Sequence, residues 1–365
     1  MDSQTPDPGG GTIEAHYDLI QELGSGCYST VYKARDKISG EIVALKKVKI
    51  FDKMQGLPMA YYRESKFLMN NSHENIISLK KIFNCHENHQ IYLVLECCEC
   101  DLNSLIKEGH GLNYKNVKQY MLQILNALGY MHSKNIAHRD IKPSNVLIDS
   151  EGKIKLADFG LARNLDHTIK PLTYNVVTMS YRAPELLMHD NHYTTSIDIW
   201  SLGCLLYTLI TGKILFNSTS SNEVSRLMSI FNICGSPNND NWPEFANYPN
   251  SNIFMSSLCN CEPILHEYLE DNLPKQFYCI IDLIEKMLSL DPSKRPTVAE
   301  ILSHPFFTDE TPFDINSSDS FMQQLSKISY LECNSYKLNH SPKLLRPQRI
   351  VPPPMITVGF APYNM

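Results

Sequence analysis

A short run near the start of the chain has the composition of a phosphate-binding turn. Residues 24–31 are Gly-Ser-Gly-Cys-Tyr-Ser-Thr-Val, and the glycines let phosphate approach the backbone N–H groups closely. A dinucleotide-binding turn would carry a third glycine and lead into a helix, but Ser29 stands at that position and a strand-like run follows. A Walker loop would need Gly-Lys-Ser or Gly-Lys-Thr, which this run lacks. Taken alone, the run fits a phosphate site and a plain hairpin turn equally well.

A lysine and a glutamate farther along could complete such a site. Lys46 ends the run Val-Ala-Leu-Lys at 43–46, and Glu64 lies in a helical segment that follows. An ion pair with a glutamate fixes the position of a lysine, which can then bind two phosphates of a nucleotide. Pairs of this kind are also common as solvated surface charges, so both interpretations stay open for this pair by itself.

Three further motifs then follow in order along the chain. They are His138-Arg139-Asp140-Ile141-Lys142-Pro143-Ser144-Asn145, Asp158-Phe159-Gly160 and Ala183-Pro184-Glu185. With the glycine-rich run and Lys46, they resemble the eukaryotic protein kinases over residues 17–307. The resemblance implies an α+β fold of two lobes, a small β-rich N-lobe and a larger α-helical C-lobe.

The resemblance also implies transfer of the γ-phosphate of ATP to a protein hydroxyl, with Mg²⁺ as cofactor. Phosphoryl transfer needs positioning and charge neutralisation more than covalent help. Asp140 would orient the attacking hydroxyl, while Asn145 and Asp158 offer the hard oxygen ligands that Mg²⁺ prefers. Lys142 would steady the transferring phosphate, and Asp-x-Lys here resembles the Ser/Thr-directed kinases, in which the position of Thr178 supports this loop.

By the same resemblance, residues 93–98 form a hinge that holds adenine. Leu95 would be the gatekeeper, and the Glu96 carbonyl and the Cys98 amide would face the base. The implied ATP site comprises Leu23, Gly24, Ser25, Gly26, Cys27, Tyr28, Ser29, Thr30, Val31, Ala44, Lys46, Leu95, Glu96, Cys98 and Leu147. A zinc site is disfavoured, because Cys97, Cys98 and Cys100 are spaced too tightly for the usual Cys pairs.

Residues 56–64, Gly-Leu-Pro-Met-Ala-Tyr-Tyr-Arg-Glu, resemble the helix on which cyclin-dependent kinases dock their cyclin. Pro58, Arg63 and Glu64 match the family, whereas Tyr61 and Tyr62 depart from it. The resemblance therefore implies a cyclin-like regulatory subunit without indicating which one.

Thr173 lies between the second and third motifs, where the family carries its activating phosphothreonine. Arg63, Arg139 and Arg163 stand at the family's three phosphate-binding positions, so charge-assisted pairs would order the loop and seat the helix. A MAP kinase would carry a tyrosine two residues beyond the threonine, and that residue is Asn175. This departure favours the cyclin-dependent branch.

The substrate pocket is the last feature that the resemblance supplies. The residues that match the family's pocket for proline after the phosphoacceptor are Val176, Val177, Met179 and Arg182. They imply Ser-Pro or Thr-Pro substrates, although Ser180 replaces the tryptophan usual beside them. Tyr28 stands where many of these kinases are inhibited by phosphorylation, and it fits a loop-tip aromatic equally well.

The elements that must position these residues change character near residue 100. Alternating runs around Ser39-Gly40 predict a hairpin, and the expected strands lie at 31–35, 41–47, 76–83 and 90–95. A helix with Pro58 in its first turn is expected over 58–69. Helical spacing then dominates, at 120–132, 197–210, 224–234 and 276–290. The predicted division is an extension (1–16), an N-lobe (17–97), a C-lobe (98–307) and a tail (308–365).

Composition excludes several classes of protein. With 43% hydrophobic and 20% charged residues among 365, the chain is neither disordered nor collagen-like. No stretch approaches the roughly 18 apolar residues of a membrane span, and the polar start is unlike a signal peptide, so we expect the nucleus or the cytoplasm and no membrane partner. A net charge of −6 without a basic block argues against nucleic acid, and 11 scattered cysteines favour reduced thiols.

The sequence thus predicts a Ser/Thr protein kinase of the cyclin-dependent type, proline-directed and acting in cell-cycle or transcription control. Two alternatives stay open: a MAP-kinase-like enzyme, and a pseudokinase that serves as a scaffold without turnover. The scaffold is disfavoured because Lys46, Asp140, Asn145 and Asp158 are all present.

Overall fold

The computed structural model describes residues 11–26, 29–49, 57–85, 90–106, 110–166, 173, 176–218, 222–249, 251 and 261–309. Cys27, Tyr28 and Asn175 lie outside these residues, as do residues 1–10 of the predicted extension and 310–365 of the predicted tail. The chain divides into two units, Met1–Phe313 and Asp314–Met365, and every described residue belongs to the first.

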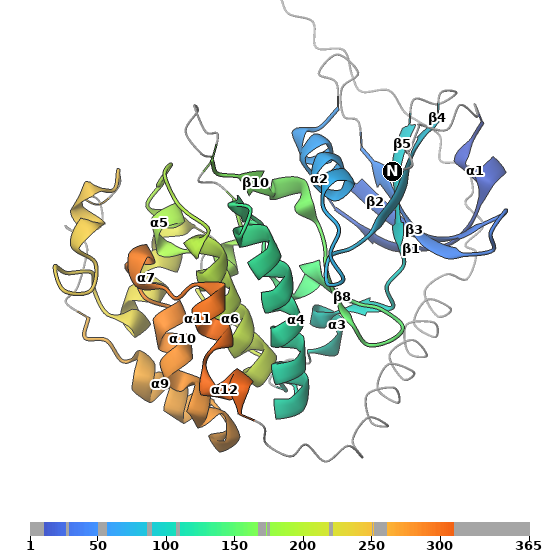
Figure 1. The fold of residues 1–365 in the computed structure, drawn as a ribbon. Coiled ribbons are helices and arrows are strands. Elements are labelled where there is room, and N and C mark those ends of the chain that lie inside the picture. The colour runs from blue at the N-terminus through green and yellow to red at the C-terminus, as the bar shows by residue number, and fades with distance from the viewer. Residues whose placement is uncertain are drawn as a thin grey trace, which may run out of the picture. The chain divides into compact units, whose positions relative to one another are not determined.

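Strands dominate the first part of the chain, as predicted. They form a five-stranded antiparallel sheet in the order β1-β2-β3-β5-β4 (Figure 1). The strands are β1 (Tyr17–Ser25), β2 (Ser29–Asp36), β3 (Ile42–Val48), β4 (Leu79–Cys85) and β5 (Gln90–Glu96). In the β2–β3 turn the Asp36 side chain accepts hydrogen bonds from the N–H groups of Ile38 and Ser39, and Gly40 takes a φ of +74°, which glycine tolerates best.

The core of this region lies against the sheet and is joined by the short helix α1 (Ile13–His16). Its buried residues are Ile13, Tyr17, Ala34, Val43, Leu45, Phe83, Cys85, Tyr92 and Val94. Val43 and Leu45 alternate along β3, as a strand with one face on the core requires. The strand β1 was not predicted, because it lies at the edge of the sheet with most side chains exposed and shows no alternation.

The helix predicted over 58–69 is α2 (Met59–Asn70). Pro58 is its N-cap in an extended conformation, not a first-turn residue as predicted. One face of α2 is buried through Glu64, Ser65, Phe67 and Leu68. The opposite face exposes Met59, Tyr62 and Met69.

Helices dominate beyond residue 101, as predicted. The two longest, α4 (Tyr114–His132) and α6 (Ser196–Thr211), contact each other, and α6 is buried from Ile197 to Thr211 (Figure 1). The other α-helices are α3 (Leu102–Leu105), α5 (Pro184–Leu187), α7 (Glu223–Cys234), α9 (Leu265–Asn272), α10 (Ile281–Met287), α11 (Val298–Leu302) and α12 (Pro305–Thr308). The single helix predicted over 276–290 is instead a 3₁₀ segment, η5 (Lys275–Ile280), followed by α10, because hydrophobic spacing over so few residues does not separate the two helix types.

Short strands hold the motif-bearing loops between the sheet and the helices. One small sheet has the order β6 (Cys100–Asp101), β8 (Val146–Ile148), β9 (Ile154–Leu156), and a second pairs β7 (Ile136–Ala137) with β10 (Arg163–Asn164). The predicted strand 76–83 begins only at Leu79, because Ile76 instead forms a parallel bridge with Leu156. The remaining 3₁₀ segments are η1 (Pro143–Asn145), η2 (Phe159–Leu161), η3 (Met179–Tyr181), η4 (Pro243–Asn247) and η6 (Pro292–Lys294).

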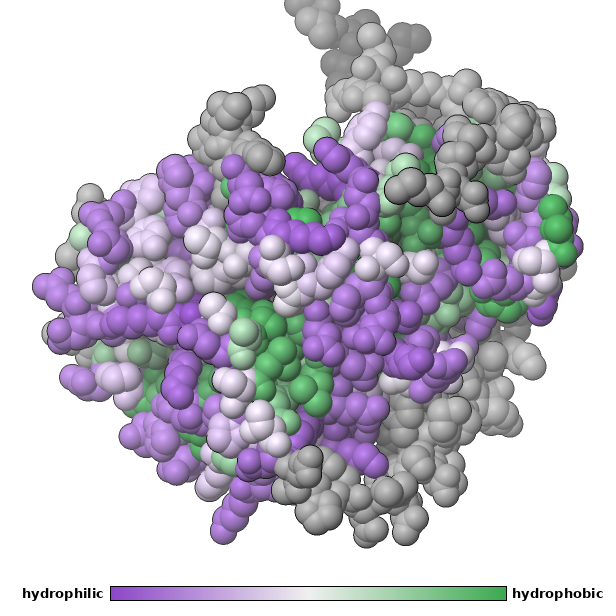
Figure 2. Space-filling view, viewed as in Figure 1, coloured by the Kyte–Doolittle hydropathy of each residue, from purple (hydrophilic) through white to green (hydrophobic). Residues whose placement is uncertain are grey.

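The fold is therefore α+β, with an antiparallel sheet and its helix α2 followed by a helical region. Hydrophilic residues cover most of the visible face of the helical region, with an apolar area near its middle (Figure 2). Within the residues described above, no helix has the length and apolar character needed to cross a membrane.

Candidate active site

The glycine-rich run forms the turn between β1 and β2. The Gly26 N–H donates to the Ser29 carbonyl, and Lys49 donates to the Ser25 hydroxyl and the Gly26 carbonyl, each at 2.8 Å. A Cβ at Gly24 would meet no atom of the described residues within 4 Å, apart from those of its two neighbours, so these residues leave the space beside the backbone open. This observation fits a phosphate site, and Lys49 is a cation at the turn that the sequence analysis missed.

A buried ion-pair cluster joins β3, α2 and the residue that follows β9. Lys46 Nζ lies 2.7 Å from both carboxylate oxygens of Glu64 and 3.1 Å from Asp158 Oδ1. Burial alone would lower the pKa of Lys46, but the two carboxylates outweigh it and raise the pKa. Burial likewise opposes the charge of Asp158, yet Lys46 holds the pKa of that carboxyl below its usual value. For Glu64 the balance is different, because burial and the charge of Asp158 raise the pKa of that carboxyl against the opposing charge of Lys46.

Close packing of α2 on the Asp-Phe-Gly segment brings Glu64 to this cluster. The rings of Phe67 and Phe159 stack with centroids 4.2 Å apart. A Cβ on Gly160 would lie only 3.2 Å from the Cβ of Ala60, so this approach of the helix depends on the glycine.

Three polar side chains, two of them from the loop between β7 and β8, surround Asp140. Lys142 Nζ donates to Asp140 Oδ2 at 2.7 Å and to the Thr178 hydroxyl at 2.9 Å. The Thr178 N–H and hydroxyl donate to Asp140 Oδ1 at 3.0 and 2.8 Å. Asn145 Nδ2 donates to the carbonyl and to Oδ2 of Asp140 at 2.8 and 2.9 Å. The tertiary structure thus brings Thr178 to a loop more than thirty residues earlier in the chain.

A buried carboxylate on α6, that of Asp198, holds the backbone at the start of this loop. Asp198 accepts hydrogen bonds from the N–H groups of His138 and Arg139 at 2.8 and 2.9 Å, and lies 3.0 Å from His132 Nε2. Burial opposes its charge, but His132 and these donors hold the pKa of Asp198 below its usual value. The His138 ring also packs against Phe159, which ties the two motifs together.

The oxygen donors near the cluster fit a hard divalent cation. The Nδ2 of Asn145 donates to Asp140, so the Oδ1 of Asn145 points away from Asp140. The Asp158 side chain is about half exposed. Across the described ranges no group of three or more His, Cys, Asp or Glu side chains could hold a metal. A cation at Asn145 and Asp158 would therefore take its other ligands from phosphate and water, as Mg²⁺ commonly does.

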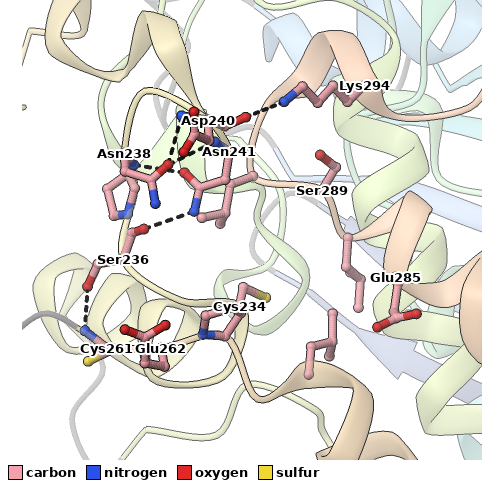
Figure 3. Close-up of a pocket in the computed structure, with 15 residues that line it drawn as sticks. Cys234, Ser236, Asn238, Asp240, Asn241, Cys261, Glu262, Glu285, Ser289 and Lys294 are labelled. Atoms are coloured by element: carbon pink, nitrogen blue, oxygen red, sulfur yellow. Dashed lines mark hydrogen bonds between the residues drawn. The ribbon is translucent and has the colours of Figure 1, made fainter.

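Two cavities have very different relations to these residues. A cavity of about 120 Å³ is lined by Gly26, Ser29, Lys46, Glu64 and Asp158, among others, and it lies between the glycine-rich turn and α2. A larger one of about 800 Å³ lies in the helical region (Figure 3) and is lined by none of the residues singled out from the sequence. The polar atoms of its Ser236, Asn238 and Asn241 bond to one another. Of these two cavities, only the smaller one is lined by residues of the Lys46 ion-pair cluster.

The predicted adenine contacts come from four separate strands. Ala44 and Leu95 are paired in register between β3 and β5 and are both buried. Leu147 lies on β8 and is half-buried, whereas Leu23 on β1 is exposed.

The three arginines and Thr173 are linked by a tyrosine that the sequence analysis missed. Burial, together with the charges of Arg139 and Arg163, lowers the pKa of Arg63, which shows that the three cations gather in one place. Arg139 Nη1 donates to the Tyr193 hydroxyl at 2.7 Å, and that hydroxyl donates to the Thr173 carbonyl at 2.9 Å. The buried Tyr193, twenty residues later in the chain, thus connects the exposed Thr173 to Arg139.

The predicted substrate pocket contains a strained residue. Val177 is buried with a φ of +68°, which a β-branched side chain rarely adopts. Its carbonyl accepts hydrogen bonds from Arg182 Nε at 3.2 Å and Nη2 at 2.9 Å. Val176 is buried beside it, and Met179 begins η3.

Comparison with known proteins agrees with this geometry. Residues 17–307 match the protein kinase domain family. "Probable cyclin-dependent kinase 10" of Dictyostelium discoideum is 40% identical over 299 residues, which are 81% of this chain and 80% of that protein. "Cell division control protein 2 homolog 1" of Trypanosoma brucei brucei is 36% identical over 307 residues, 81% of this chain and 99% of the relative.

A solved structure gives the same result at the level of the fold. A chain of the "Crystal Structure of the yeast RNA Pol II CTD kinase CTDK-1 complex" superposes with a TM-score of 0.74 at 30% identity, covering 85% of this chain and 98% of that one. The chain therefore belongs to the protein kinase family and is related to the cyclin-dependent kinases.

Proposed function

We propose that the protein is a Ser/Thr kinase that transfers the γ-phosphate of ATP to protein hydroxyls, with its lobes meeting near residues 97–98. The observation that carries this proposal is the presence of two clusters of charged groups, close enough that the charge of Lys142 in one acts on the pKa of Asp158 in the other. Lys46 is tied to Glu64 and Asp158, and Asp140 is held by Lys142 and Thr178.

Each side chain has a distinct task in this proposal. The Asp140 carboxylate accepts a hydrogen bond from the substrate hydroxyl and aims it at the phosphate. Lys142 supplies positive charge beside the point of transfer, and Lys46 holds the phosphates. Asn145 and Asp158 would hold Mg²⁺, and the cation would neutralise part of the negative charge of the triphosphate.

The geometry of Val177 supports a preference for proline after the phosphoacceptor. Because the Val177 carbonyl already accepts two hydrogen bonds from Arg182, it would be a poor acceptor for an N–H group of a bound substrate. A buried N–H without an acceptor costs about 1–3 kcal/mol, roughly ten- to hundredfold in a rate constant. Proline has no N–H and avoids this cost.

Two features support regulation by a cyclin-like subunit and by phosphorylation. Met59, Tyr62 and Met69 form an exposed apolar face on the same helix that carries Glu64, so a partner on this face would steady the ion-pair cluster. The arginine cluster near Thr173 would accept a phosphate on that residue. Both named relatives carry cyclin-dependent kinase or cell-division names, in line with this proposal.

The test is phosphate transfer by the native complex, purified through a tag on this chain from its own cells. Ser-Pro and Ser-Ala peptides are compared, and Asp140→Asn serves as the control. We expect transfer to Ser-Pro that the control loses, with a cyclin-like protein among the co-purified chains. No transfer above the control, with Thr173 phosphorylated and ATP bound, would instead support the pseudokinase scaffold, and a second loop phosphate would support a MAP-kinase-like enzyme.

A further inference from the structure

Arg182 is itself held by a side chain from a distant helix. While Nε and Nη2 point to the Val177 carbonyl, Nη1 donates to Glu223 Oε1 at 3.0 Å. Arg182 is buried, with only 6% of its surface exposed, so its fork has little freedom to turn. Glu223 therefore adds a contact on Nη1 to the contacts that the Val177 carbonyl makes with Nε and Nη2.

Glu223 is well placed to remain a fixed carboxylate. It is the first residue of α7, whose N-cap Asn222 accepts a hydrogen bond from the Ser225 N–H. The positive end of the helix dipole favours a negative charge at this position. Its second oxygen, Oε2, lies 2.8 Å from His189 Nε2, so both carboxylate oxygens are engaged by different elements.

His189 reaches this oxygen from a backbone conformation that costs free energy. Its φ is +63°, in the left-handed region where glycine is the residue without penalty. A strained residue persists where the surrounding contacts hold it, and such residues gather at functional sites. The chain of contacts thus links two left-handed residues, His189 and Val177, through Glu223 and Arg182.

We propose that Glu223, held by His189, is a positioning residue that sets the preference for proline after the phosphoacceptor. It acts by keeping Arg182 on the Val177 carbonyl, which denies an acceptor to any residue that brings an N–H group. When this hold is lost, Arg182 turns, the carbonyl becomes available to a substrate N–H, and Ser-Ala improves relative to Ser-Pro. The inference rests on the proposed function and names the determinant of its substrate class.

The test measures kcat/KM for Ser-Pro and Ser-Ala peptides with the full chain in its native complex. Glu223→Ala should lower the Ser-Pro to Ser-Ala ratio about fivefold, and Glu223→Gln should fall in between because it keeps a neutral acceptor. The matched control is Glu267→Gln, which changes the same residue type in the first turn of α9 and should leave the ratio unchanged.

A second variant separates selectivity from stability. His189→Gly removes the bond to Glu223 but relieves the left-handed strain, so the melting temperature should hold or rise while the ratio falls about two- to threefold. A purely structural role would instead change stability and slow both peptides in parallel.

The outcomes distinguish this inference from the function on which it rests. A ratio near one in the unaltered protein would overturn the proposed proline-directed substrate class and the inference with it. A high ratio that survives both Glu223→Ala and His189→Gly would overturn the inference alone.

Discussion

Individual side chains in this protein are ionised because of what surrounds them. Lys46 is buried but charged because two carboxylates face it, and Asp198 is buried but charged because a histidine and backbone N–H groups point at it. Neither group would keep its charge in an apolar site without these partners. The roles of single residues here are therefore set by contacts across the chain.

Asp198 predicts how stability depends on pH. Its pKa in the folded protein lies below the ordinary value of about 3.9, so the unfolded chain binds the proton more readily. The stabilisation is present above that value and is lost as the pH falls from it through the folded pKa. Asp198→Asn should lower the free energy of unfolding by about 2–3 kcal/mol at neutral pH. It should also make the loss of stability in acid less steep. The test is the melting temperature of both proteins from pH 3 to 7. A variant whose melting temperature falls as steeply in acid as that of the unaltered protein would contradict the prediction.

The helix α2 is the element on which the active site depends most. It contributes Glu64 to the cluster and Phe67 to the stack on Phe159, and it approaches Gly160 through Ala60. Its other face is exposed and apolar, so one helix connects the proposed partner surface to the site of chemistry.

This packing predicts a pair of compensating substitutions. Gly160→Ala places a Cβ about 3.2 Å from Ala60, which should push α2 outward and reduce phosphate transfer at least about tenfold. Adding Ala60→Gly restores the space and should recover much of the loss, beyond what the roughly 1 kcal/mol cost of glycine in a helix removes. Steady-state kinetics of both single variants and the double variant provide the test, and strictly additive losses would show that the contact does not matter.

At the scale of the whole molecule, the arginine cluster connects the sheet side to the helical region. Arg63 lies on α2, Arg139 in the loop after β7 and Arg163 on β10, and their charges oppose one another. Without an anion, the repulsion among the three arginines favours separation of the elements that carry them. A phosphate on Thr173 would attract all three cations and make the net interaction favourable.

Phosphorylation of Thr173 should therefore raise the melting temperature of the native complex. We expect the increase to shrink in high salt, because Thr173 is exposed and Arg63 and Arg163 are only partly buried, and charges that reach solvent are screened within about 10 Å at 0.1 M. Arg163→Gln should reduce the increase, since one of the three cations is lost. The measurement compares phosphorylated and phosphatase-treated complex at two salt concentrations; an increase that is independent of both salt and Arg163 would argue for a different phosphate partner.

The sequence by itself determined the class of fold and the residues of the central motifs. The helical spacing of apolar residues in α4 was sufficient for that helix, because its buried residues recur with the helical period. The helix α6 is buried on every side and therefore carries no such period. The exposed edge strand β1 and the 3₁₀ segment η5 were missed because their residues carry no distinctive period.

Only the tertiary structure decided which distant residues meet. Tyr193 reaches Thr173, and Glu223 reaches Arg182, across gaps in sequence that no local pattern spans. The left-handed backbone of Val177 and His189 is likewise imposed by these contacts, because local preference opposes it in both residues. The catalytic motifs are local and visible in the sequence, whereas the proposed substrate preference depends on long-range packing.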